Sequence, residues 1–329
     1  MLIKKIEKPE KTIISVLGIK IAHNHKKIFM DLYNKNRFYN TIIEKNFSTA
    51  ERRGILEDRF YKKTGYFPNL DNPQTFNEKI TWLKLYYHDD LQRKCVDKIT
   101  FKDYITQILG KEYVIPTIAV YDRAEDIDFD KLPQKFVIKS NCGWGGDQVI
   151  IVKDKTKINK DRIRRQANSW LISWNNYFYQ SFEWDFENLK PKIIIEEFLE
   201  AIDGDVPDYK FHCFNGDPKA ILVIEDRFKK SKTKKTFLDD NWDVLPIRRP
   251  HSTVNKKIKK PELFDEMLKI SRKLSKQFPF VRVDFYNADN KIYIGELTFY
   301  PGGGVEPFTS KEWDAQLGKL LKLPDVKEN

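Results

Sequence analysis

The chain has 329 residues, of which 40% are hydrophobic and 14% aromatic, and this composition excludes a disordered protein. It contains no apolar run of about eighteen or more residues, so we expect no membrane-spanning helix. Its first residues lack the apolar core and cleavage site of a signal peptide. Three scattered cysteines are too few for a disulfide framework or a zinc site, and they favour a reducing, cytoplasmic location.

The net charge of +11 suits an anionic partner, which could be nucleic acid, an anionic membrane surface or an anionic substrate. No zinc-finger spacing and no RNP-like aromatic strand accompany the charge, so we expect no nucleic acid to bind. A basic surface without a specific partner is the alternative.

Residues 1–60 are rich in lysine and carry apolar residues at helical spacing, so we expect amphipathic helices there. These helices either pack on the domain behind them or make a peripheral contact with the inner face of the membrane. The apolar positions are Ile28, Phe29, Leu32, Tyr33, Phe38, Ile42 and Ile43.

Two further helices and an acidic motif follow. A capping box formed by Thr75 and Glu78 predicts a helix that runs towards Tyr87, and the next helix is expected to stop at Gly110. Asp126-Ile127-Asp128 matches the Asp-x-Asp motif of nucleotide-sugar glycosyltransferases. A polar turn is the favoured interpretation, because no buried strand precedes the motif.

A strand, a glycine-rich loop and a second strand succeed one another between residues 136 and 152. Glycines let backbone N–H groups approach a phosphate closely. Lys139, at the end of the first strand, would supply the positive charge that an oligophosphate needs. The loop lacks the Gly-Lys-Ser/Thr ending of a Walker A motif, and an ordinary glycine hairpin is the alternative.

Two strands are expected in the next part of the chain. A buried strand over Lys192–Glu200 ends in acidic residues, and the backbone at its end could hydrogen-bond a flat heterocycle. A strand over Pro207–Phe214 alternates polar and aromatic residues and ends at an Asn215-Gly216 hairpin turn. Helices are expected over residues 261–278 and 307–323.

The most informative stretch runs from Val281 to Gly304 and predicts two strands joined by a polar turn at residues 288–290. Charged and apolar residues alternate, so Arg282 and Asp284 share a face. A three-residue loop would set Arg282 opposite Glu296, whereas a two- or four-residue loop would put the two carboxylates on opposite faces. Clustered charges need compensation, which either a divalent cation or a cross-strand Arg–Glu ion pair could supply.

The order of these pieces resembles the ATP-grasp superfamily. Three segments resemble the TupA-like ATP-grasp proteins, which are encoded among genes for bacterial cell-surface polysaccharides such as teichuronopeptide and capsule: Thr75–Lys79, Leu132–Lys139 and Pro207–Phe211. The resemblance covers about residues 55 to 320 and implies an α+β fold in which two α+β subdomains grip ATP. We expect three parts: a basic, mainly helical N-terminal region (1–95), a small subdomain with the glycine-rich lid (96–195) and a large subdomain with the magnesium site (196–329).

The resemblance also implies which residues bind the nucleotide. Two lysines would hold the ATP phosphates, namely Lys98 and Lys139. The flexible phosphate lid would contain Gly143, Gly145 and Gly146. Adenine would meet the backbone of a segment formed by Glu196, Glu197, Phe198 and Leu199, and the ribose hydroxyls would meet Asp208.

The remaining implied roles concern the metal and the reaction. Magnesium would be held by Asp284, Glu296 and Thr298, where Thr298 replaces the asparagine that is usual in the superfamily. A hydroxyl holds magnesium less surely than an amide oxygen does. Arg282 would stabilise the oxyanion of a tetrahedral intermediate, and weaker candidates for phosphate or substrate contact are Lys210 and Arg227. The usual Rossmann-like N-terminal domain of the superfamily is not expected, because the basic helical region takes its place.

The resemblance implies an ATP- and magnesium-dependent carboxylate–amine ligase that forms an amide through an acylphosphate. The expected substrates are an amino acid or similar amine and a uronic acid of an acidic glycan or lipid-linked glycan. One alternative is a glycosyltransferase of capsule- or O-antigen-type polysaccharide synthesis, which rests on the motif at Asp126. The other is a non-catalytic nucleotide-binding module, which the intact pair of Asp284 and Glu296 disfavours.

Overall fold

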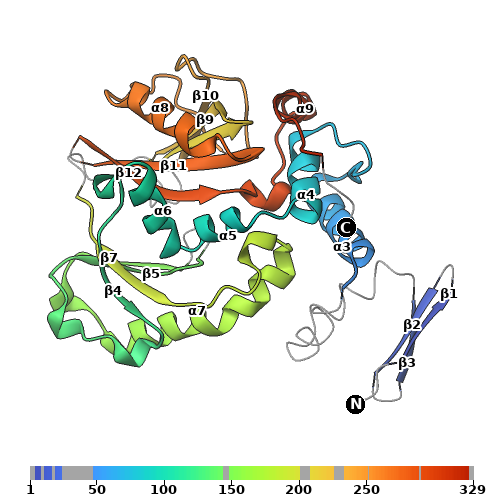
Figure 1. Cartoon of the computed structure of the whole chain (residues 1–329), viewed down its shortest axis with the longest axis horizontal. Coiled ribbons are helices and arrows are strands. Elements are labelled where there is room, and N and C mark those ends of the chain that lie inside the picture. The colour runs from blue at the N-terminus through green and yellow to red at the C-terminus, as the bar shows by residue number, and fades with distance from the viewer. Residues whose placement is uncertain are drawn as a thin grey trace. The chain divides into compact units, whose positions relative to one another are not determined.

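A computed structural model of the chain describes residues 47–143, 148–200, 208–225, 233–250, 252–288 and 290–325, except for the side chains of residues 172–180, together with the backbone of three N-terminal strands (Figure 1). The chain divides into two compact units, Met1–Pro68 and Asn69–Asn329, and each is described by itself. No helix in the described part of the chain is long and apolar enough to cross a bilayer.

The first unit contains strands where helices were expected. Strands β1 (Lys4–Lys8), β2 (Lys11–Val16) and β3 (Ile19–His23) form an antiparallel sheet in that order. The prediction of helices is wrong for this segment, and the reason is its β-branched content, which favours extended backbone over helix. The apolar positions between residues 28 and 43 lie outside the described residues. The helix α3 (Thr49–Thr64) starts at a capping box between Ser48 and Glu51.

The second unit contains two antiparallel sheets. The four-stranded sheet has the order β4-β7-β5-β6, and its strands are β4 (Thr117–Tyr121), β5 (Phe136–Ser140), β6 (Val149–Val152) and β7 (Ile193–Glu197). The five-stranded sheet has the order β10-β9-β8-β11-β12, and its strands are β8 (Asp208–Phe214), β9 (Asp217–Glu225), β10 (Lys234–Leu238), β11 (Phe280–Ala288) and β12 (Lys291–Thr298). All three hairpins predicted from the sequence are present, namely β5–β6, β8–β9 and β11–β12.

Each sheet buries one face against a helix (Figure 1). The odd-numbered residues of β8 and β11, such as Phe211 and Phe285, pack against α8 (Phe264–Ser275). The rings of Phe211 and Phe264 lie 5.8 Å apart. On the four-stranded sheet, Phe136 and its neighbours pack against α7 (Lys160–Ser181). Burying each large apolar side chain contributes roughly 1.5–3 kcal/mol. The alternation of a strand then points the even-numbered, polar residues away from α8.

The remaining helices of the second unit are α4 (Phe76–Tyr86), α5 (Asp90–Val96), α6 (Thr100–Ile108) and α9 (Lys311–Leu320). The capping box predicted at Thr75 and Glu78 opens α4. The α4 helix packs against α9 and against a turn at Pro301–Gly304. The acidic motif at residues 126–128 follows no buried strand: Ala124–Asp126 and Phe129–Lys131 are short 3-10 helices, as expected for a polar turn.

Candidate functional site

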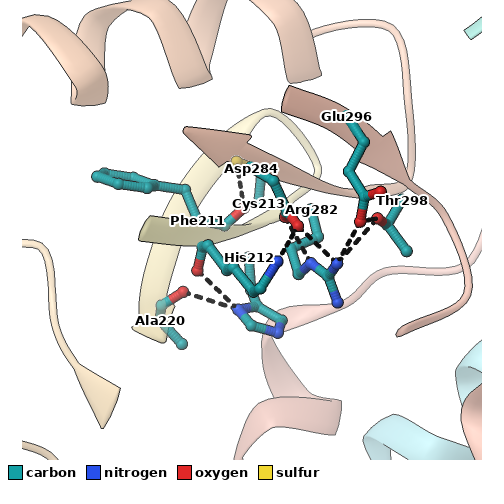
Figure 2. A network of polar contacts seen from close by, with 9 residues as sticks. Phe211, His212, Cys213, Ala220, Arg282, Asp284, Glu296 and Thr298 are labelled. Atoms are coloured by element: carbon teal, nitrogen blue, oxygen red, sulfur yellow. Dashed lines mark hydrogen bonds and ion pairs between the residues drawn. The ribbon is translucent and has the colours of Figure 1, made fainter. Parts of the chain in front are cut away.

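Polar side chains line the face of the five-stranded sheet that points away from α8, and six of them occupy neighbouring positions on β8, β11 and β12. Direct pairing places Lys210 beside Asp284, Asp284 beside Glu296, and His212 beside Arg282. We call this set the charged face; its members are Lys210, His212, Arg282, Asp284, Glu296 and Thr298, and Figure 2 labels the last five.

A β-bulge brings the two carboxylates together. Ala288 pairs with Lys291, so a two-residue loop connects β11 and β12, and such a loop was expected to put Asp284 and Glu296 on opposite faces. The register shifts just beyond Asp284, and Gly295 is the extra residue on β12. Because of this extra residue, the side chains of β12 beyond the bulge point to the face opposite to the one that a regular strand would give them. The loop argument is therefore wrong, yet the carboxylates still share a face.

Arg282 is the centre of the hydrogen bonds on the charged face (Figure 2). Its Nε and Nη2 atoms donate to the two oxygens of Asp284 over 2.6 and 2.7 Å. Nη2 also donates to Glu296 Oε1 at 2.9 Å and to Thr298 Oγ1 at 3.0 Å. Thr298 Oγ1 in turn donates to Glu296 Oε1 over 3.0 Å, and Lys210 Nζ donates to Asp284. One guanidinium thus sets the position of both carboxylates.

The two carboxyls differ in their electrostatics. Burial raises the pKa of the Asp284 carboxyl above its ordinary value, although Arg282 and Lys210 act in the opposite direction. Burial also acts to raise the pKa of Glu296, but Lys210, Arg282 and Lys98 hold it well below the ordinary value. Burial opposes the charge of Arg282, yet Asp284 and Glu296 raise its pKa. Glu296 therefore stays an anion and Arg282 stays a cation.

His212 is the neutral member of the charged face. Its Nδ1 lies 3.2 Å from the carbonyl oxygen of Lys210 and 3.1 Å from that of Ala220. Both partners are acceptors, so Nδ1 carries the hydrogen and Nε2 carries the lone pair. Burial, Arg282 and Arg249 lower the pKa of His212 to about 3.

A second group of charges lies on the four-stranded sheet and at the start of α6; we call Lys98, Lys102 and Lys139 the lysine cluster. Lys139 and Lys102 share the buried carboxylate of Glu196, with Lys102 Nζ 2.6 Å from Glu196 Oε1. Lys98 Nζ donates to the carbonyl oxygen of Gly143 at 2.6 Å. Lys102 and Lys139 thus share one carboxylate while Lys98 bonds a neutral carbonyl, so the lysine cluster carries positive charge in excess, as an anionic ligand requires.

Lys98 links the lysine cluster to the charged face. Burial lowers the pKa of Lys98, Glu296 acts to raise it, and Lys139 lowers it further. Glu296 belongs to the five-stranded sheet and Lys139 to the four-stranded sheet, so Lys98 interacts electrostatically with a charged residue of each sheet.

The residues expected to bind adenine and ribose lie at the ends of β7 and β8. The N–H of Glu197 donates to the carbonyl oxygen of Pro116 at 3.1 Å, so this N–H is already paired. Phe198 and Leu199 follow the end of β7 and are half-buried. Asp208 is buried at the start of β8. Gly145, Gly146 and Arg227 lie outside the described residues.

Three further charged or polar side chains of the two sites were not expected from the sequence: Lys102, His212 and Arg249. Lys102 stands four residues after Lys98, a spacing that places both on one side of a helical turn. His212 has the same strand parity as Lys210, so alternation alone could have found it. Arg249 is buried, and its guanidinium lies 3.7 Å from the centre of the Phe308 ring. No sequence pattern predicts that contact.

The charged face offers oxygen ligands of the kind that magnesium prefers. Asp284 and Glu296 supply carboxylates and Thr298 a hydroxyl. Among the described residues no three His, Cys, Asp or Glu side chains converge as a metal cage. Magnesium is commonly bound through one or two carboxylates and the phosphates of a nucleotide, so the donor set fits that mode.

The sequence matches the TupA-like ATP-grasp family over residues 78–322. No curated protein matches the chain. Similar solved structures include the D-alanine–D-alanine ligase of Helicobacter pylori, with 16% identity, coverage of 75% of this chain and 69% of that one, and a TM-score of 0.42. The D-alanine–D-alanine ligase of Bacillus anthracis complexed with ATP shares 19% identity over 63% of this chain, at a TM-score of 0.37, and the match spans 54% of that ligase.

The ATP-grasp ligase PsnB with its minimal precursor matches 97% of this chain and 84% of its own, with 12% identity and a TM-score of 0.42. The family match extends over about three quarters of the sequence and includes the charged face, the lysine cluster and α4 from Glu78 onwards. This chain belongs to the TupA-like ATP-grasp family.

Proposed function

We propose that the protein is an ATP- and magnesium-dependent carboxylate–amine ligase. One observation supports this proposal above the others. The charged face carries a carboxylate pair organised by Arg282, the lysine cluster carries an excess of positive charge, and Lys98 feels Glu296 and Lys139 together. A nucleotide triphosphate with its magnesium ion has the charge pattern that this arrangement complements.

Each group has a role that follows from its charge. The lysine cluster holds the phosphates, and Glu196 keeps Lys102 and Lys139 in position. Asp284, Glu296 and Thr298 hold magnesium, which when bound neutralises charge on the phosphate oxygens. Adenine lies against the Glu197 carbonyl, Phe198 and Leu199, and Asp208 binds the ribose hydroxyls.

The reaction transfers a phosphoryl group and then forms an amide. A substrate carboxylate oxygen attacks the γ-phosphorus, the bond between the γ-phosphorus and its bridging oxygen breaks, and ADP leaves. An amine then attacks the carbonyl carbon of the acylphosphate, inorganic phosphate leaves, and the nitrogen releases a proton. Arg282 lies beside the charge that develops on the carbonyl oxygen and stabilises it. No covalent bond to the protein is needed.

We infer that the carboxylate belongs to a uronic acid of a cell-surface polysaccharide or of its lipid-linked precursor, and that the amine is an amino acid or a similar compound. The resemblance to TupA-like proteins and the net charge of +11 support an acidic glycan. The inferred location is the cytoplasm, with peripheral contact at the inner membrane face when the glycan is lipid-linked.

The test is an assay of ADP and phosphate release from magnesium-ATP in the presence of uronic-acid oligosaccharides and a panel of amino acids. We expect release that requires both substrates and that Asp284→Asn abolishes, while Asp217→Asn, which changes an aspartate paired with Arg272 at the end of the sheet, retains it. Equal release with and without the substrates would refute the ligase. Release of UDP from a UDP-sugar would favour a glycosyltransferase instead.

A further inference from the structure

The α4 helix buries a polar stripe where an amphipathic helix normally buries apolar residues. Asn77, Thr81 and Lys84 stand at positions i, i+4 and i+7, so they lie on one side of the helix. Each is at most 1% exposed. Buried polar groups are costly unless they are paired, so the stripe must have partners.

All three side chains contact backbone carbonyls of the segment that follows β12, and Asn77 Nδ2 also donates to Asp314 Oδ2 on α9 at 3.1 Å. Lys84 Nζ donates to Gly303 O at 2.7 Å, and Asn77 Nδ2 donates to Glu306 O at 3.1 Å. Thr81 Oγ1 lies 3.2 Å from Gly304 O and 2.8 Å from Asn77 O, and its single proton serves one of them at a time.

The segment needs such support because its backbone is unusual. Gly302, Gly303 and Gly304 have φ angles of 60°, 63° and 69°, so three consecutive residues are left-handed. Glycine alone adopts this conformation readily, and it adopts others as readily. A Cβ at Gly304 would meet Thr81 Oγ1 at 2.9 Å and Ile80 Cγ2 at 3.0 Å, so the turn lies directly on α4. We call Pro301–Gly304 the glycine turn.

The glycine turn leads from the charged face across the five-stranded sheet. It begins three residues after Thr298, at one edge of the sheet. Glu306 then reaches Lys235 Nζ at 3.8 Å, on the opposite edge strand β10. Register places Lys235 on the same side as the charged face, through Ile224 and Asp208. The segment 301–306 therefore runs from the β12 edge towards β10 on the side of the sheet that carries the charged face.

We propose that Lys84 is a positioning residue of this site: by holding the carbonyl of Gly303 it fixes the glycine turn as a wall against which the non-nucleotide substrates are placed. The inference rests on the proposed ligase function. It adds Lys84, which would act on the substrates only through the backbone of the glycine turn. The lysine cluster is separate from this wall, so the binding of ATP is not expected to depend on Lys84.

A purely structural role for Lys84 is the competing explanation. Asp185 is buried, burial and Glu183 raise the pKa of its carboxyl well above the ordinary value, and Lys84 acts in the opposite direction. If Lys84 served only that acidic group, its loss would lower stability without separating the kinetics of the two substrates.

The chain contains a matched control for the test. Lys79 lies on the same helix, and its ammonium also donates to backbone carbonyls, Gly318 O at 2.8 Å and Leu321 O at 2.7 Å, but these belong to the end of α9. Lys84→Met and Lys79→Met each remove one such ammonium. Only the first change releases the glycine turn.

We expect Lys84→Met to raise the KM for the carboxylate or the amine about tenfold or more and to lower kcat, while the KM for ATP stays within about twofold. Lys79→Met should keep the wild-type kcat and the wild-type KM values for the carboxylate, the amine and ATP. By hydrogen–deuterium exchange, peptides that span residues 299–305 should exchange faster in Lys84→Met and not in Lys79→Met. If Lys84→Met does not fold, Thr81→Val tests the same wall with a change of nearly equal volume.

The outcomes separate this inference from the proposed function. A wild-type enzyme without substrate-dependent ADP release would refute the ligase, whereas the exchange experiment would still decide whether Lys84 holds the glycine turn. An active wild type whose Lys84→Met variant keeps all KM values, or unchanged exchange at residues 299–305, would overturn the inference and leave the ligase intact.

Discussion

At the scale of single residues, Arg282 matters more than any neighbour on the charged face, because both carboxylates and the threonine hydroxyl accept its hydrogen bonds. A planar guanidinium can serve several oxygens at once, whereas an ammonium acts as a point charge. The proposed chemistry adds a second demand, since the same group must also face the developing oxyanion.

Replacing Arg282 with lysine should therefore lower kcat/KM about 10²- to 10³-fold while the protein stays folded, because the charge is kept and the fork of donors is lost. Steady-state ADP release measures the effect. Arg272→Lys is the control, since Arg272 pairs with Asp217 away from the charged face. Equal activities of the two variants would contradict the role of Arg282.

His212 gives a pH dependence whose sign is fixed by its neutral state. An unfolded histidine binds a proton near pH 6.5, whereas burial, Arg282 and Arg249 lower the folded pKa to about 3. Stabilisation from the neutral ring is therefore complete above pH 6.5 and is lost as the pH falls towards 3. The slope from this group approaches about 1.4 kcal/mol per pH unit between these values.

His212→Gln should remove that slope, because glutamine keeps a donor near the carbonyls of Lys210 and Ala220 but does not titrate. Urea unfolding of both proteins between pH 7 and 4 measures the difference, and shared carboxylates cancel in the comparison. Parallel pH profiles would show that His212 is protonated in the folded protein.

At the scale of elements, Gly295 decides whether the two carboxylates proposed to bind magnesium share a face. Alternation of residue types indicated that Arg282 and Asp284 share a face, and this follows from strand geometry alone. The position of Glu296 could not be obtained the same way, because a bulge changes the parity of a strand and depends on contacts with the partner strand. The helices with capping boxes were predictable, since their signals are local.

The N-terminal strands could not be predicted from local sequence signals. Lysine-rich sequence with scattered apolar residues fits a helix and a strand about equally well, and the β-branched residues of β2 favour the strand. Likewise, the pairing of Glu196 with Lys102 joins elements that are 94 residues apart in sequence (102 to 196), and no local pattern predicts such a contact.

Gly295→Ala should lower both stability and ligase activity. A Cβ at this position would lie 2.7 Å from Cε2 of the Tyr286 ring, so the ring or the bulge must shift, at a cost of about 1–3 kcal/mol. A shifted bulge moves Glu296 relative to Asp284, so activity should fall by more than stability explains. Gly54→Ala is the control, because nothing lies within 4 Å of its Cβ and a helical alanine is favoured. Wild-type activity in Gly295→Ala would mean that the carboxylate pair tolerates a change of register.

At the scale of the whole second unit, the proposed nucleotide joins two sheets that have separate hydrophobic cores. The charges on each sheet are incomplete without it: the lysine cluster has excess positive charge, and Glu296 remains an anion in the field of Lys98. A ligand that binds both sheets should therefore stabilise them together, because binding to the folded state alone shifts the unfolding equilibrium.

We expect magnesium-ATP at about a hundred times its Kd to add about 2.7 kcal/mol to the free energy of unfolding and to raise the melting temperature of both sheets in one transition. Lys139→Met should abolish most of this shift, because it removes an ammonium that we propose to bind the phosphates while Lys102 still pairs with Glu196. Lys135→Met should keep it, since Lys135 is exposed and pairs with Glu200 outside the lysine cluster. Differential scanning calorimetry with and without magnesium-ATP measures the shift. Equal shifts in the two variants would show that Lys139 does not bind the nucleotide. Two separate transitions in the presence of magnesium-ATP would show that ATP binds to one sheet alone.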